Sequence, residues 1–130
     1  MGEPRAGVKV GMSGDGNFAA TMRGYELKTG IEGALVDRTA AVATQMIDDA
    51  RVRVTRFDFA PGAETGWHTH GMDYVITAVT QCEMTLEEPG GNTRHVVVAA
   101  GDAYVRKAGV AHNVINGGDE PMSFVEVELK

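Results

Sequence analysis

The chain has 130 residues, 43% of them apolar and 23% charged, which are ordinary proportions for a single globular domain. Eighteen acidic and twelve basic residues give a net charge of −6 at pH 7, so neither nucleic acid nor a membrane surface is expected as a partner, because both attract clustered Lys and Arg. The single cysteine excludes an internal disulfide framework and a multi-cysteine metal site, and the absence of a long apolar run or a recognisable leader predicts a cytoplasmic protein.

The first part of the chain carries the weakest structural signals. Residues 1–17 are rich in glycine and show little helical or strand periodicity, so we treat them as a separate N-terminal segment and place a single folded domain at residues 18–130. Within that domain, residues 18–51 are the hardest to interpret. The alanine-rich stretch 36–47 fits a short helix or a strand, and the sequence does not decide between the two.

From residue 51 onward, short runs rich in Val, Ile and Thr alternate in polarity and end at turn residues. The predicted strands are residues 51–60, 67–70, 73–80, 83–88, 94–100, 103–107, 112–116 and 122–129. The turn at 89–92 (PGGN) joins two of them as a hairpin. Many short strands separated by turn signals are typical of a sandwich or a small barrel, so we predict an all-β protein.

The four histidines are unevenly placed along these strands. His68 and His70 are two residues apart, so on a strand their side chains leave the same face. His112 lies at the start of a later predicted strand, after a turn that contains glycine. Imidazole is the commonest protein ligand of first-row transition metals, and three together suit such an ion. His95 lies away from these residues and is interpreted as a surface or packing side chain.

Two spaced motifs around these histidines resemble the two sequence motifs of the cupin superfamily. The first family motif is G-x5-H-x-H-x3,4-E-x6-G, and its positions fall, within residues 62–81, on Gly62, His68, His70, Tyr74 and Gln81. The second is G-x5-P-x-G-x2-H-x3-N, and its positions fall, within residues 101–116, on Gly101, Lys107, Gly109, His112 and Asn116. The stretches 66–75, 108–116 and 124–130 also resemble small single-domain cupins of the β-alanine-degradation type.

The resemblance implies a small antiparallel double-sheet β-barrel of the cupin, or jelly-roll, type with a metal held inside. The family's ligands are three histidines and a glutamate, so His68, His70 and His112 carry over, while Tyr74 stands at the glutamate position. Asp73, one residue earlier, is kept as a candidate fourth ligand or a neighbour of the metal. A regular strand cannot point both residues inward, so two inward sets stay open: Tyr74, Ile76 and Ala78, or Asp73, Val75, Thr77 and Val79.

Three protein ligands leave positions on a metal open to substrate and oxygen, which is the mark of a catalytic site. The resemblance therefore implies a metal-dependent enzyme for a small anionic or enolisable molecule. We favour a dioxygenase-type reaction that uses iron(II) and oxygen, with nickel, zinc or manganese as alternative metals. Two other functions stay open: an isomerase, cyclase or decarboxylase that uses the metal as a Lewis acid, and a ligand-binding cupin without turnover.

Two further residues are candidates for catalytic roles beside the metal. Tyr74, if it points inward, is a hydrogen-bond donor or a general acid. Arg106, just before Lys107 of the second motif, can hold a substrate carboxylate with two hydrogen bonds.

The residues between the two histidines of the first motif suggest a partner. On a regular strand Trp67 and Thr69 face away from His68 and His70, and therefore lie on the outside of the barrel. An aromatic side chain on the outer face of a sheet is typical of a surface that binds a second subunit. We therefore predict a homodimer.

Overall fold

The strands of the computed structural model form two antiparallel sheets within residues 38–130, the part of the chain that the structure describes. The elements in chain order are β1 (Val42–Asp48), β2 (Val52–Phe59), β3 (His68–Thr69), β4 (Asp73–Ala78), β5 (Cys82–Glu88), the short 3-10 turn η2 (Pro89–Gly91), β6 (Asn92–Val98), β7 (Ala103–Arg106), β8 (Ala111–Asn116) and β9 (Met122–Leu129). The predicted N-terminal segment 1–17 and the first part of the predicted domain lie outside the described residues.

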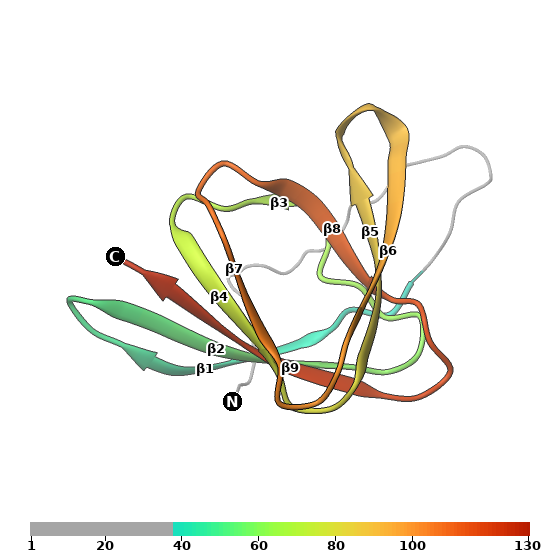
Figure 1. Cartoon of the computed structure of the whole chain (residues 1–130), viewed down its shortest axis with the longest axis horizontal. Coiled ribbons are helices and arrows are strands. Elements are labelled where there is room, and N and C mark those ends of the chain that lie inside the picture. The colour runs from blue at the N-terminus through green and yellow to red at the C-terminus, as the bar shows by residue number, and fades with distance from the viewer. Residues whose placement is uncertain (1–37) are drawn as a thin grey trace.

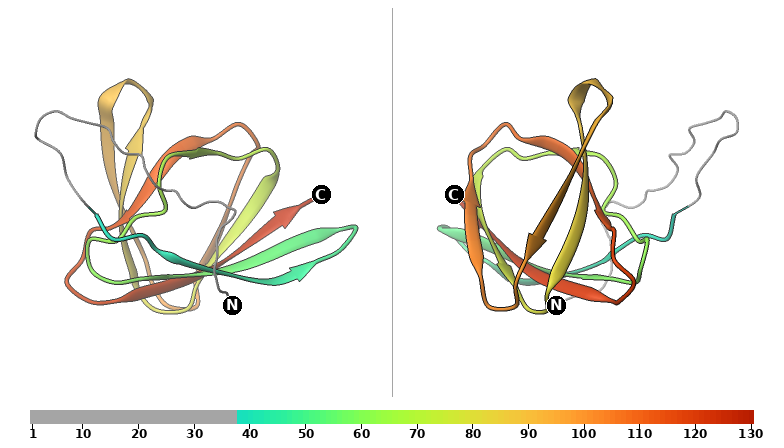
Figure 2. Two further views of the ribbon diagram at one scale, coloured as in Figure 1. Left: turned by 180° about the vertical axis from the view of Figure 1, so that it is seen from behind. Right: turned by 45° about the vertical axis from the view of Figure 1, so that its right-hand side comes forward.

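The larger sheet has the strand order β1-β2-β9-β4-β7, and the smaller has the order β3-β8-β5-β6. Figure 1 shows the last strand, β9, running between β2 and β4, while β3, β8, β5 and β6 form the opposite wall. The further views in Figure 2 show the same two walls closing on each other. The predicted all-β, double-sheet barrel is confirmed.

Within the stretch 36–47 that the sequence left open between helix and strand, residues 42–47 belong to a strand, β1. β1 pairs antiparallel with β2, with Val42 opposite Asp58 and Asp48 opposite Arg53, and the register shifts at a bulge between Gln45 and Ile47. The predicted turn at 89–92 does join β5 and β6 into a hairpin. Within residues 38–130, no helix is long and apolar enough to cross a membrane, and the cytoplasmic location stays a prediction.

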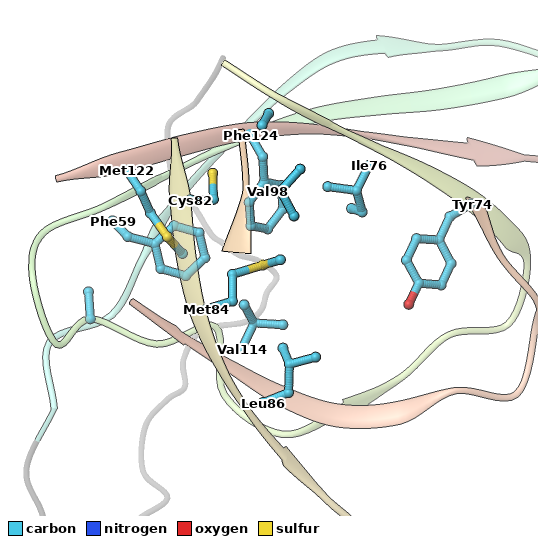
Figure 3. Close-up of a cluster of buried hydrophobic side chains, with 12 residues drawn as sticks. Phe59, Tyr74, Ile76, Cys82, Met84, Leu86, Val98, Val114, Met122 and Phe124 are labelled. Atoms are coloured by element: carbon cyan, nitrogen blue, oxygen red, sulfur yellow. The ribbon is translucent and has the colours of Figure 1, made fainter. Parts of the chain in front are cut away.

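An apolar core fills one part of the space between the sheets. Three phenylalanines make its centre: the ring centroid of Phe124 lies 5.4 Å from that of Phe57 and 5.3 Å from that of Phe59. The methionines Met84 and Met122 pack beside them (Figure 3). Tyr74 lies apart from this group, and its hydroxyl oxygen points away from β4 into the interior (Figure 3). The Tyr74 hydroxyl therefore marks the side of the interior at which the apolar core ends.

Candidate metal centre

Strand pairing brings the two histidine motifs together. His68 on β3 lies directly opposite His112 on β8. The two strands stay joined beyond this pair, because the His70 N–H donates to the Val110 carbonyl at 2.8 Å and the Gly109 N–H donates to the His70 carbonyl at 2.7 Å. Residues that are 42 positions apart in the sequence, His70 and His112, therefore meet in space.

The three imidazoles converge through the same ring atom. The Nε2 atom of His70 lies 3.1 Å from the Nε2 atom of His68 and 3.1 Å from that of His112. The rings meet edge to face, with interplanar angles between 74° and 85°. His70 and His112 are only 5% and 4% exposed. The cluster is therefore a buried point at which three nitrogens meet.

This arrangement fits a metal ion. Nitrogens bound at about 2.1 Å to one ion lie about 3 Å apart when they subtend a right angle at it, and the observed separations are 3.1 Å. Three imidazoles at such spacing suit a first-row divalent ion. The residues that could hold this ion are His68, His70 and His112.

A hydrogen-bond chain fixes the orientation of His68. Its Nδ1–H donates to the Gly66 carbonyl at 2.8 Å, which leaves the Nε2 lone pair facing the other two rings. Gly66 has φ +89°, a backbone conformation that glycine adopts without strain. The Gly66 N–H donates to the Asn113 side-chain oxygen at 2.9 Å, and the Asn113 amide donates to Glu64 at 2.7 Å and to Glu87 at 3.0 Å. Asn113, next to His112, thus anchors the turn that aims His68.

Burial keeps these histidines neutral. Burial, together with the neighbouring His68, His112 and Arg106, lowers the pKa of His70 to about 3. Burial likewise lowers the pKa of His112 to about 4, helped by His68 and Arg106. The pKa of His68 is also lowered by burial. Neutral imidazole is the form that binds metals, so the cluster is ready to bind an ion near neutral pH.

Tyr74 borders this cluster from β4. In β4 the residues Tyr74, Ile76 and Ala78 are buried and their neighbours are half-buried, so the first of the two inward sets is the one found. The Tyr74 ring stacks on that of His70, with centroids 3.8 Å apart. Its hydroxyl is buried and has no hydrogen-bond partner among residues 38–130, and burial raises its pKa to about 12. Tyr74 is therefore a protonated phenol with an unused donor beside the histidines.

The other two predicted site residues are Asp73, which lies outside the histidine cluster, and Arg106, which faces the interior. The Asp73 carboxylate does not join the histidines: it accepts a hydrogen bond from the Ala108 N–H at 2.8 Å and holds the loop between β7 and β8 against β4. Arg106 lies directly opposite Tyr74 in the β4–β7 pair, and directly opposed residues share a face. Arg106 therefore faces the interior, and it forms no hydrogen bond or salt bridge within the described part of the chain.

Two carboxylates on β9, which were not among the predicted site residues, also lie near His70. A ring nitrogen of His70 and a carboxylate oxygen of each of Glu126 and Glu128 lie within 4.8 Å of one another. Burial raises the pKa of both carboxyl groups, and for Glu126 the charge of Glu128 adds to this effect. The signal was present in the sequence, because strand alternation puts both glutamates on the same face as the core residue Phe124.

Comparisons with known proteins agree with this geometry. A family model described as a cupin domain matches residues 55–128. The chain is 53% identical over 93 residues to the beta-alanine degradation protein BauB of Pseudomonas aeruginosa, a match that covers 72% of this chain and 97% of the relative. A crystal structure of a cupin domain from Bordetella pertussis Tohama I superposes with a TM-score of 0.70 and 45% identity, over 73% of this chain and 98% of that one.

More distant solved structures share the fold. The polyketide cyclase RemF of Streptomyces resistomycificus superposes with a TM-score of 0.56 at 21% identity, over 79% of this chain and 80% of that one. At this level of identity the likeness concerns the arrangement of the strands alone.

Proposed function

Because this chain belongs to the cupin family, we propose that it is a metal-dependent enzyme whose three histidines hold one divalent first-row ion. Iron(II) is the preferred ion, with nickel, zinc and manganese as alternatives. The observation that supports this most directly is that the Nε2 atom of His70 lies 3.1 Å from the Nε2 atoms of both His68 and His112. When bound, such an ion supplies Lewis-acid polarisation of a coordinated oxygen and, as iron(II), the redox chemistry of oxygen.

The proposed substrate is a small organic anion. Arg106 places on the interior face, beside Tyr74, a guanidinium that forms no ion pair with any residue the structure describes, and guanidinium binds a carboxylate with two parallel hydrogen bonds. The Tyr74 hydroxyl is a second donor, which burial keeps protonated. Together they orient an anion over the histidines and hold a proton at the phenolic oxygen. The name of the relative BauB refers to beta-alanine degradation, so short carboxylates related to β-alanine are the first to test.

The proposed reaction is a dioxygenase-type oxidation, and oxygen uptake tests it. The full chain loaded with iron(II) under anaerobic conditions is expected to consume oxygen with at least one member of a panel of short oxo acids, diketones and thiol acids. In Arg106→Gln, we expect KM for the active carboxylate to rise about 10- to 100-fold with a smaller change in kcat, because a hydrogen bond to a charged group is worth about 1.5–3 kcal/mol. The control is Lys107→Gln, which removes an exposed neighbouring charge.

Two results would contradict this proposal. Conversion of the substrate by the zinc-loaded protein without oxygen uptake would favour Lewis-acid chemistry instead. An unchanged KM in Arg106→Gln would remove Arg106 from substrate binding.

We further propose that the protein is a homodimer that pairs the outer faces of two larger sheets. Successive cross-strand pairs put Val54, Val127, Val75 and Val105 in one row on that outer face. Val105 is 63% exposed, and an apolar row of this kind favours burial against another subunit.

Light scattering of the full chain is expected to give twice the chain mass of 13.8 kDa. Val105→Glu is expected to shift the protein to 13.8 kDa. The matched control is Val97→Glu on β6 of the other sheet, because Val97 is equally exposed at 65%. A monomeric wild type would rule the dimer out, and dissociation by both variants would rule out the larger sheet as the interface.

A further inference from the structure

The inner face of β9 presents a buried carboxylate that lacks a partner. Glu126 is 9% exposed, and within residues 38–130 its side chain forms no hydrogen bond or salt bridge. It lies opposite Thr55 of β2 and Ile76 of β4, neither of which carries a charge. Burying a carboxylate without compensation is costly, so in its charged form Glu126 needs a positive charge in the interior to balance it.

The arginine whose charge acts on Glu126, Arg53, already pairs with other carboxylates. Glu128, two residues further along β9, lies opposite Arg53 of β2, and their side chains form an ion pair at 3.7 Å. Arg53 also pairs with Asp48 of β1 at 3.6 Å. The single charge of Arg53 is thus shared by two other carboxylates, and within residues 38–130 Glu126 forms no ion pair.

The group that does face Glu126 is His70. One ring nitrogen of His70 and one carboxylate oxygen of each of Glu126 and Glu128 lie within 4.8 Å of one another. His68 and His112 form their own group with His70 and do not belong to the carboxylate group. His70 is therefore the histidine that connects the convergent nitrogens with the inner face of β9.

We propose that Glu126 is a positioning residue of the metal centre, and that its carboxylate balances the charge of the bound ion through His70. This inference rests on the proposed function, in which the three histidines hold a divalent ion. Three neutral imidazoles contribute no negative charge, and a buried dication favours an anion nearby. A carboxylate beside a ligating histidine also holds the imidazole ring in place and makes the ring nitrogen a stronger metal ligand.

The inference is tested by titrating the metal-free full chain with Co²⁺ in competition with a coloured chelator. Glu126→Gln is expected to bind Co²⁺ about 10- to 100-fold more weakly than wild type, and Glu126→Asp is expected to recover part of the loss. The visible absorption spectrum of bound Co²⁺ should change in Glu126→Gln, because the field at His70 changes. Glu120→Gln is the control for removal of an exposed charge, and Glu128→Gln should have a smaller effect than Glu126→Gln.

The possible outcomes separate this inference from the proposed function. A wild-type chain that binds no Co²⁺ would overturn both. Strong wild-type binding with the same affinity and spectrum in Glu126→Gln would overturn the role of Glu126 alone. Two ions per wild-type chain, reduced to one in Glu126→Gln, would also overturn it, because the carboxylates would then hold an ion of their own. Thermal melting of the metal-free variants distinguishes weaker binding from loss of the fold, and Glu126→Asp decides if Glu126→Gln does not fold.

Discussion

Replacing His112 with alanine is expected to reduce the metal content of the tag-free protein from about one first-row ion per chain to a small fraction of that value. His112 is buried, and its Nε2 atom lies 3.1 Å from that of His70 at the point where the ion would sit. Removing a residue that hydrogen-bonds to a metal ligand lowers metal affinity about 10- to 100-fold. Removing a ligand itself is therefore expected to lower the affinity further. Elemental analysis by mass spectrometry, after purification and after anaerobic loading, measures the effect.

The fourth histidine provides the matched control for this substitution. His95 lies on β6 and is exposed, and in the described part of the chain its ring hydrogen-bonds only to the Thr85 hydroxyl, at 3.1 Å. His95→Ala should therefore keep the full metal content. Equal metal content in wild type and His112→Ala would exclude His112 as a ligand. A wild type that stays empty after anaerobic loading would favour a ligand-binding barrel without a metal.

The fold could be predicted from sequence wherever one face of a strand is buried. β4 alternates between half-buried and buried positions along its whole length, and such strands show the two-residue period that the sequence analysis used. β1 does not, because its residues are exposed or half-buried throughout. Without a buried face, no alternation marks the strand, and an alanine-rich stretch reads equally well as a helix. Only pairing with β2 identifies β1 as a strand.

The three histidines of the candidate site could be predicted from the local spacing of residues in the two motifs. His68 and His70 share a face by strand geometry, and the second motif supplied His112. The choice between Asp73 and Tyr74 could not be made, because apolar residues follow each of them at alternate positions.

The carboxylates were missed for a different reason. Glu126 and Glu128 belong to the last strand, and their place beside His70 depends on the insertion of β9 between β2 and β4. The alternation of residues 122–129 indicates that both glutamates face the interior, but it does not show which residues they lie beside, because that pairing joins segments far apart in sequence.

Acid is expected to destabilise the metal-free protein through its buried histidines. The ordinary pKa of histidine is 6.5, while burial lowers the pKa of His112 to about 4 and that of His70 to about 3. Below pH 6.5 the unfolded chain takes up protons that the folded chain does not, so the contribution of each group is fully present above pH 6.5 and is lost as the pH falls. At pH 5 the loss is about 2 kcal/mol for each group.

Glu126 acts in the opposite direction. Burial raises its pKa above the ordinary 4.5, so its folded form keeps a proton that the unfolded chain has released. Its contribution to stability is therefore present at low pH and is lost as the pH rises through the raised value. Lowering the pH therefore stabilises the folded protein through Glu126 and destabilises it through the histidines. Two variants can separate these opposing contributions.

Urea unfolding of the metal-free protein between pH 7.5 and pH 5 measures both contributions. Relative to wild type, His112→Asn should flatten the fall in unfolding free energy by about 2 kcal/mol at pH 5, because one titrating histidine is gone. Glu126→Gln should steepen the fall, because the opposing carboxyl is gone, and it should raise stability at pH 7.5. Parallel pH profiles for all three proteins would show that neither group titrates differently in the folded and unfolded chains. Such a result would remove the argument that burial keeps these histidines in the neutral form that binds a metal.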